Sequence, residues 1–117
     1  MKSNPIEEKS FHFAVRSVRL YKHLIEKKHE YVLSKQLLRS GTSIGANVSE
    51  AERGQSKPDF VSKMSIALKE ANETDYWLRL LYASEYITRA EYESMKRDVN
   101  ELISLLVSIC RTASQSK

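Results

Sequence analysis

The groups best suited to chemistry in this sequence are carboxylates and imidazoles at helical spacings. Glu26 and His29 have the Glu-x-x-His spacing of di-iron bundles, but such sites need two copies and further inward carboxylates. Glu70, Glu73 and Asp75 could do acid–base work together, yet no nucleophile or cofactor motif accompanies them. We therefore predict no enzyme activity, no metal and no cofactor, and we interpret these three carboxylates as partners in salt bridges or subunit contacts.

A second candidate is the stretch 41–45 (GTSIG), which resembles a phosphate-binding glycine loop. It lacks the Lys-Ser/Thr ending of a P-loop, and no strand precedes it. Two glycines inside a helix each cost about 1 kcal/mol relative to alanine, so their presence needs a compensating reason. We predict that Gly41 and Gly45 allow a neighbouring backbone to approach closely.

Cations form a third candidate, because they recur at steps of three and four. One set lies on a single face of the first expected helix: Lys9, His12, Arg16, Arg19 and His23. Stripes of this kind contact phosphate backbones without reading sequence. Together with a group on the next helix they give our candidate nucleic-acid contacts: Lys9, Arg16, Arg19, Lys35, Arg39 and Arg53. The alternative, which composition alone favours, is a solvated face kept soluble by its charge.

Four amphipathic helices are predicted to position these residues, at about 5–27, 31–53, 57–84 and 89–111. Asn4, Ser56 and Thr88 stand where N-caps are expected, and Gly54 is expected to end the second helix in a left-handed conformation. The chain of 117 residues has room for one domain, and its connections are short. We predict an all-α, antiparallel up-down-up-down four-helix bundle spanning residues 1–117.

The first helix has more apolar surface than one bundle helix needs, because its apolar arc covers more than half the circumference. Covering by another subunit is the simplest explanation, so we predict a homo-oligomer. The expected interface residues are Phe13, Leu20, Leu24, Ile66, Trp77 and Leu80. The alternative is scattered surface hydrophobics, which are normal on monomers.

Two stretches are familiar in combination: 36–51 (QLLRSGTSIGANVSEA) and 66–78 (IALKEANETDYWL). With the opening Asn4-Pro5-Ile6 and the segment 9–11 (KSF), they resemble the bacterial four-helix bundle family linked to intervening sequences in large-subunit ribosomal RNA genes. That family is similar to the accessory variability determinant of diversity-generating retroelements. The resemblance implies a pentameric ring without catalytic residues. For the retroelement relatives it also implies a nucleic-acid-binding surface and a reverse transcriptase partner.

These observations lead to one functional prediction and one alternative. A single cysteine, a polar N-terminus and the lack of a long apolar run indicate a cytoplasmic protein without membrane contact. We expect a homo-oligomeric, non-catalytic adaptor that contacts the phosphate backbone of RNA or DNA through its basic helix faces, without reading sequence. No single-strand stacking motif is visible, so specificity is expected from RNA shape or a protein partner. The alternative is a protein-binding scaffold without a nucleic-acid role.

Overall fold

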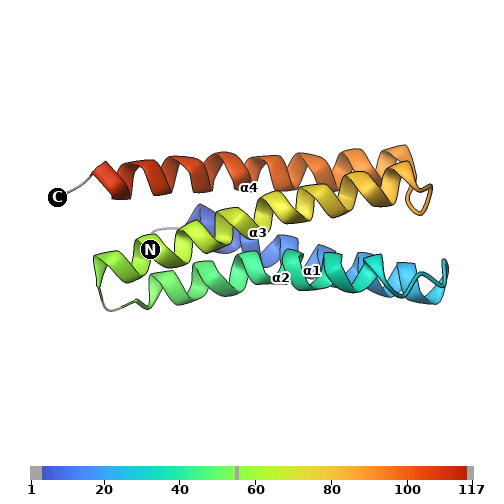
Figure 1. The fold of residues 1–117 in the computed structure, drawn as a ribbon, viewed down its shortest axis with the longest axis horizontal. Coiled ribbons are helices and arrows are strands. Elements are labelled where there is room, and N and C mark those ends of the chain that lie inside the picture. The colour runs from blue at the N-terminus through green and yellow to red at the C-terminus, as the bar shows by residue number, and fades with distance from the viewer. Residues whose placement is uncertain (1–3, 55, 116–117) are drawn as a thin grey trace.

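The computed structural model describes residues 4–54 and 56–115 and contains all the predicted helices. They are α1 (Pro5–Glu26), α2 (Leu33–Glu52), α3 (Lys57–Ala83) and α4 (Arg89–Gln115). Successive helices run in opposite directions in a bundle of 48 × 27 × 19 Å (Figure 1). The predicted all-α four-helix bundle is confirmed. Most helix bounds agree within two residues, but α4 continues four residues past the expected end at 111.

Three of the helix starts have the caps that the sequence predicts. The side chain of Asn4 accepts a hydrogen bond from the Glu7 amide, and Ser56 does the same for Asp59. Thr88 and Glu91 form a reciprocal capping box before α4, in which each side chain accepts from the other's amide at 3.1 and 2.8 Å. Because the first amides of a helix have no partner within it, these side chains fix where α1, α3 and α4 begin.

The helix ends differ from the prediction. Gly54 does not adopt a positive φ, so its expected left-handed conformation is wrong. An added Cβ there would lie 2.6 Å from a carboxylate oxygen of Asp59, so the glycine supplies room rather than backbone freedom. Within residues 4–54 and 56–115, the positive φ angles belong instead to His29 (54°) and Glu85 (68°), in the turns after α1 and α3. Both side chains are exposed at these turns.

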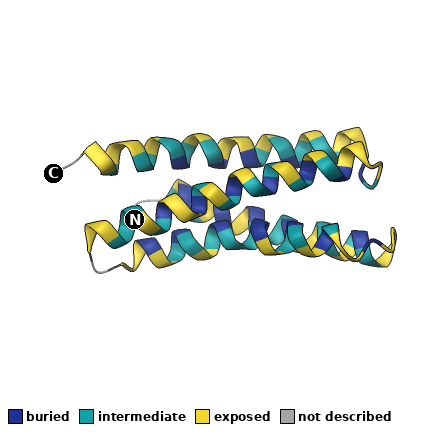
Figure 2. Ribbon diagram, viewed as in Figure 1, coloured by how far each residue is buried: buried dark blue, intermediate teal, exposed yellow. Residues whose placement is uncertain are grey.

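The core runs along the bundle axis and receives side chains from all the helices (Figure 2). Each helix contributes a stripe at steps of three and four, which keeps its apolar face inward along nearly parallel neighbours. The largest fully buried hydrophobic side chains are Phe13, Leu24, Leu37, Ile44, Met64, Leu78, Leu81, Leu102, Leu106, Val48 and Val99. None of the helices, over the residues described, is both long and apolar enough to span a membrane.

The seam between α1 and α2 is the place where small residues decide the packing. A Cβ added at Gly41 would lie 2.2 Å from the hydroxyl oxygen of Ser17, and one added at Gly45 would lie 3.1 Å from the carbonyl oxygen of Ser10. The prediction that the glycines serve close helix packing is confirmed. The seam between α1 and α4 is much less closely packed than the three seams between consecutive helices. Because it is less closely packed, the α1–α4 seam depends more on polar contacts than the other three seams do.

Candidate nucleic-acid interface

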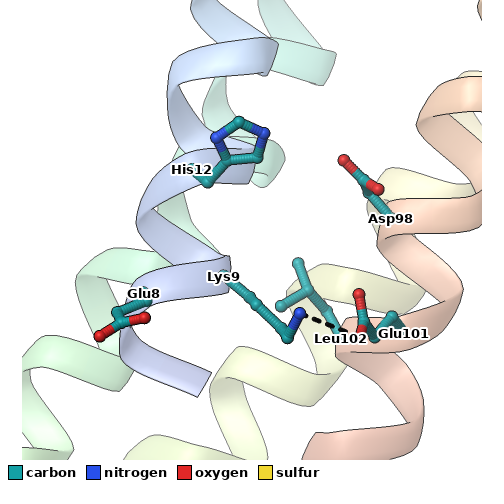
Figure 3. Close-up of a pocket in the computed structure, with 6 residues that line it drawn as sticks. All are labelled: Glu8, Lys9, His12, Asp98, Glu101 and Leu102. Atoms are coloured by element: carbon teal, nitrogen blue, oxygen red, sulfur yellow. Dashed lines mark ion pairs between the residues drawn. The ribbon is translucent and has the colours of Figure 1, made fainter. Parts of the chain in front are cut away.

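The basic stripe of α1 faces acidic residues of α4 over part of its length. Nζ of Lys9 lies 3.1 Å from a carboxylate oxygen of Glu101 (Figure 3). Arg16 lies 2.6 Å from a carboxylate oxygen of Asp98, and its guanidinium also donates to the carbonyl and the hydroxyl of Ser94 at 3.3 and 2.7 Å. These two candidates join α1 to α4 across the loosely packed seam.

A pocket opens in the same seam, lined by Glu8, Lys9, His12, Asp98, Glu101 and Leu102. Figure 3 shows His12 on α1 and Asp98 on α4, on opposite sides of this opening. Its walls carry both signs of charge, and the Lys9–Glu101 pair crosses it. Within residues 4–54 and 56–115, no three His, Cys, Asp or Glu side chains are grouped to hold a metal ion. The pocket is thus a surface opening with more carboxylates than cations in its lining.

Arg39 on α2 is also engaged, in this case by α3. Its guanidinium lies 3.2 Å from a carboxylate oxygen of Glu70 and contacts Glu73, which also accepts a 3.1 Å hydrogen bond from the Trp77 indole. The interpretation of these carboxylates as salt-bridge partners is confirmed. Asp75 likewise pairs with Lys96 of α4 at 2.5 Å, and it pairs with an arginine one turn along α3.

Arg53, at the end of α2, lies in a region where the charges are balanced. Its guanidinium contacts the hydroxyl of Ser49. Nearby, Glu50 accepts a hydrogen bond from Lys63 at 3.0 Å, which raises the pKa of that lysine above its ordinary value. Asp59 lines the same opening. A phosphate approaching Arg53 would therefore also meet carboxylates.

The two remaining candidates, Arg19 and Lys35, are exposed and make no hydrogen bond or ion pair with the described part of the chain. Lys35 lies in the first turn of α2, and Arg19 lies about two helical turns before the end of α1. Three further cations between them in sequence are exposed and make no ion pair with the described residues. We call this group the hairpin-end cluster: Arg19, Lys22, Lys27, Lys28 and Lys35. Sequence reasoning missed Lys22, Lys27 and Lys28, because Glu26 and Glu30 flank the Lys-Lys pair and make the turn look charge-balanced.

The carboxylates that flank Lys27 and Lys28 in sequence, Glu26 and Glu30, form no ion pair with them in the described part of the chain. Glu91 of α4 lines an opening with Arg19 but is bonded to the Thr88 amide. Glu30 is only 8% exposed. Its carboxylate accepts hydrogen bonds from the first amides of α2, at 3.1 Å from Val32, 2.9 Å from Leu33 and 2.6 Å from Ser34. This acid thus caps the positive end of the α2 dipole. Glu26 is exposed but forms no ion pair with the neighbouring lysines within the residues described.

The expected oligomer interface is partly wrong. Phe13 and Leu24 are 1% and 0% exposed within the single chain, so they belong to its core and offer no surface to another subunit. Leu20 and Trp77 are partly buried against the same core. Leu80 is partly buried as well.

Exposed apolar surface does occur on α1, but on a different line. Phe11 is 70% exposed and Val18 is 40% exposed, with the half-buried Val15 between them at helical spacing. Ile66 on α3, at 38%, is the expected interface residue with a clearly exposed side chain. The direction of the apolar arc was misjudged because α1 must face both α2 and α4.

The fold and its surface define a class, a four-helix bundle in which ion pairs join neighbouring helices. Within the described residues, the five cations of the hairpin-end cluster make no ion pair. The chain belongs to the 23S rRNA-intervening sequence protein family, whose model matches residues 2–108. It is similar to the crystal structure of a protein of unknown function from the S23 ribosomal protein family of Bacteroides thetaiotaomicron VPI-5482. That protein is 59% identical, with 90% of this chain and 97% of that chain covered and a TM-score of 0.88. No curated protein matches the chain. The predicted family is confirmed.

Proposed function

We propose that this protein is a non-catalytic, homo-oligomeric adaptor that binds the phosphate backbone of nucleic acid through the hairpin-end cluster. The observation that carries the proposal is the group of five exposed cations, from the second half of α1 to the first turn of α2, that have no carboxylate partner among the described residues. A lysine or arginine already paired with a carboxylate has much of its charge cancelled for an approaching phosphate. An unpaired one can displace a condensed counterion, which is the main source of sequence-independent affinity.

RNA is the ligand that we favour. The family name refers to 23S rRNA, and the name of the solved relative's family refers to the ribosome. Neither name states an activity, so each supports only the choice of the first ligand to test. In the same proposal the protein acts in the cytoplasm, where ribosomal RNA is present. A reverse-transcriptase-like partner remains an expectation from the resemblance alone.

The homo-oligomeric state is supported by the exposed line of Phe11, Val15 and Val18, together with Ile66 on α3. Apolar side chains aligned on one helix face are typical of a surface that another chain covers. Five subunits are what the family resemblance implies. A ring would repeat the hairpin-end cluster, and the fields of the repeated clusters would add.

The test is a binding titration with labelled structured RNA and a matched DNA duplex at 50 and 200 mM salt. Five phosphate contacts predict a loss of affinity of about 500-fold for a duplex across that range. Reversing two charges, Arg19→Glu with Lys35→Glu, should weaken binding strongly and make the salt dependence shallower by about two contacts. The control is Arg111→Glu, an exposed cation near the C-terminal end of α4, at the opposite end of the bundle.

Weak binding at both salt concentrations would refute the proposal and leave the cluster as a solvated surface. Unchanged affinity in the double reversal, with the oligomer intact, would refute the assignment of the site. The second candidate function, a protein scaffold without a nucleic-acid role, is favoured by the exposed Phe11 and Val18. A stoichiometric protein partner that survives nuclease treatment, together with weak RNA binding, would select that function.

A further inference from the structure

The turn between α1 and α2 exposes an aromatic ring among the unpaired cations. Tyr31 is 54% exposed and the following Val32 is 70% exposed. Lys27 and Lys28 precede them in the same turn, and Lys35 follows in the first turn of α2. An aromatic face beside cations is the combination with which proteins hold single-stranded nucleic acid, because every base offers a ring to stack on.

This turn is held in one conformation by buried polar contacts. The Glu30 carboxylate binds three amides of the α2 start, and the Glu30 amide donates to the carbonyl of Leu24 at 2.9 Å. The hydroxyl of Ser34 donates to the Glu30 carbonyl at 2.7 Å. Tyr31 follows directly after this anchored residue. A ring presented from a fixed turn loses little conformational freedom on binding a ligand.

Tyr31 differs from the other exposed tyrosines, which already have ring partners. Tyr82 is stacked on Tyr92 with centroids 4.7 Å apart. Tyr76 meets Trp77 edge-on at 5.1 Å and lies under a guanidinium of α3. The only ring near Tyr31 within the described residues is His29, tilted by 48° at 6.5 Å. The contact between these two is a 3.2 Å approach of Nδ1 to the tyrosine hydroxyl, so the ring faces are not stacked.

We propose that the turn at residues 27–32 binds an unpaired nucleobase against the Tyr31 ring, with the flanking lysines on the adjacent phosphates. This inference rests on the proposed function and adds to it a preference for unpaired over fully paired RNA. It differs from our expectation from the sequence, in which no single-strand stacking motif was visible. A polyanionic partner is favoured over a protein because the one carboxylate inside the turn, Glu30, is buried and bonded to backbone. The exposed surface of the turn is therefore cationic and apolar.

The experiment compares two RNA probes, a hairpin with a single-stranded loop and the same stem as a continuous duplex. The variants are Tyr31→Ala, Tyr31→Phe and, as the matched control, Tyr76→Ala. Tyr31→Ala should weaken binding of the looped hairpin by roughly 5- to 150-fold and leave duplex binding unchanged, because stacking on one base is lost. Tyr31→Phe keeps the ring and should bind like the wild type. Tyr76→Ala should leave both affinities unchanged.

A fluorescent base analogue placed in the hairpin loop supplies a second readout, independent of affinity. Its emission should be quenched on binding to the wild type and to Tyr31→Phe, and not on binding to Tyr31→Ala. Circular dichroism and thermal unfolding check that each variant keeps the fold. If the wild type binds both probes and Tyr31→Ala binds each with the wild-type affinity, this inference is overturned while the proposed function stands. An equal loss of affinity for both probes also overturns it, because the ring would then contribute to binding the phosphate backbone and not to stacking on an unpaired base.

If the wild type binds neither probe, both the inference and the proposed function fall. In that case, a nuclease-resistant protein partner lost in Tyr31→Ala would identify the turn as a protein-docking surface.

Discussion

The cations of the α1–α2 hairpin fall into two regions that behave differently. Lys9 and Arg16, in the first part of α1, lie opposite Glu101 and Asp98 and tie the helix to α4. Arg19, only one turn further along, has no such partner and belongs to the hairpin-end cluster. The same residue type at the same helical spacing thus stabilises the bundle in one region and remains available to a ligand in the other. The difference lies in α4. Its Glu101 and Asp98 pair with the first region, whereas Glu91, which lines one opening with Arg19, accepts a hydrogen bond from the Thr88 amide.

Glu30 anchors the turn of the second region to the start of α2, and removing its carboxylate should give the largest effect on stability. Glu30→Ala leaves three amides at the start of α2 without an acceptor, two of them on partly or fully buried residues. Losing a helix cap and orphaning buried donors should lower the free energy of unfolding by about 2–3 kcal/mol. Urea denaturation measures the loss. Glu30→Gln keeps one acceptor oxygen and should lose less of the free energy of unfolding. If Glu30→Ala is as stable as the wild type, Glu30 does not cap α2.

Arg16→Met should have a smaller effect, and on stability alone. The arginine is partly buried and makes contacts with both Asp98 and Ser94. Surface ion pairs contribute up to about 1 kcal/mol, and the added hydrogen bonds raise the expected loss to about 1–2 kcal/mol. Thermal unfolding should register this loss, while RNA affinity at 50 mM salt should stay close to wild type. A large fall in RNA affinity with unchanged stability would mean that Arg16 contacts phosphate and that the two regions are one site.

The sequence predicted the fold well because helix starts and core stripes are local signals. The caps at Asn4, Ser56 and Thr88 were predictable for this reason, since each bonds to an amide three residues away. The start of α2 was less predictable. It depends on Glu30, a charged residue that reads as solvent-exposed until the fold places its carboxylate at the free amides.

The candidate site was predicted only in part, because the sequence of one helix does not show which of its cations form ion pairs with another helix. The step from Arg16 to Arg19 is the same as elsewhere in the stripe, yet Asp98 lies 82 positions away in sequence from the arginine that it binds. Arg39 was likewise predicted to contact phosphate, but it forms ion pairs with carboxylates of α3 that the sequence of α2 does not reveal. The interface prediction for α1 was wrong for the same reason. Periodicity shows the width of the apolar arc, but only the positions of α2 and α4 decide that Phe13 is buried and Phe11 is exposed.

Asp98→Asn gives the smallest effect and tests the comparison most directly, because it releases a paired cation without removing it. The amide keeps the size of the side chain and one acceptor oxygen, while the charge that neutralises Arg16 is lost. If pairing is what separates the two regions, Arg16 should then add to the field of the hairpin-end cluster one turn away. An exposed charge interaction of about 0.2–1 kcal/mol corresponds to a gain in RNA affinity of roughly 1.5- to 5-fold at 50 mM salt. The double variant Asp98→Asn with Arg16→Met should return to the wild-type affinity. If Asp98→Asn alone leaves the affinity unchanged, the bound RNA does not extend from the turn along the α1–α4 seam, and the site ends at Arg19.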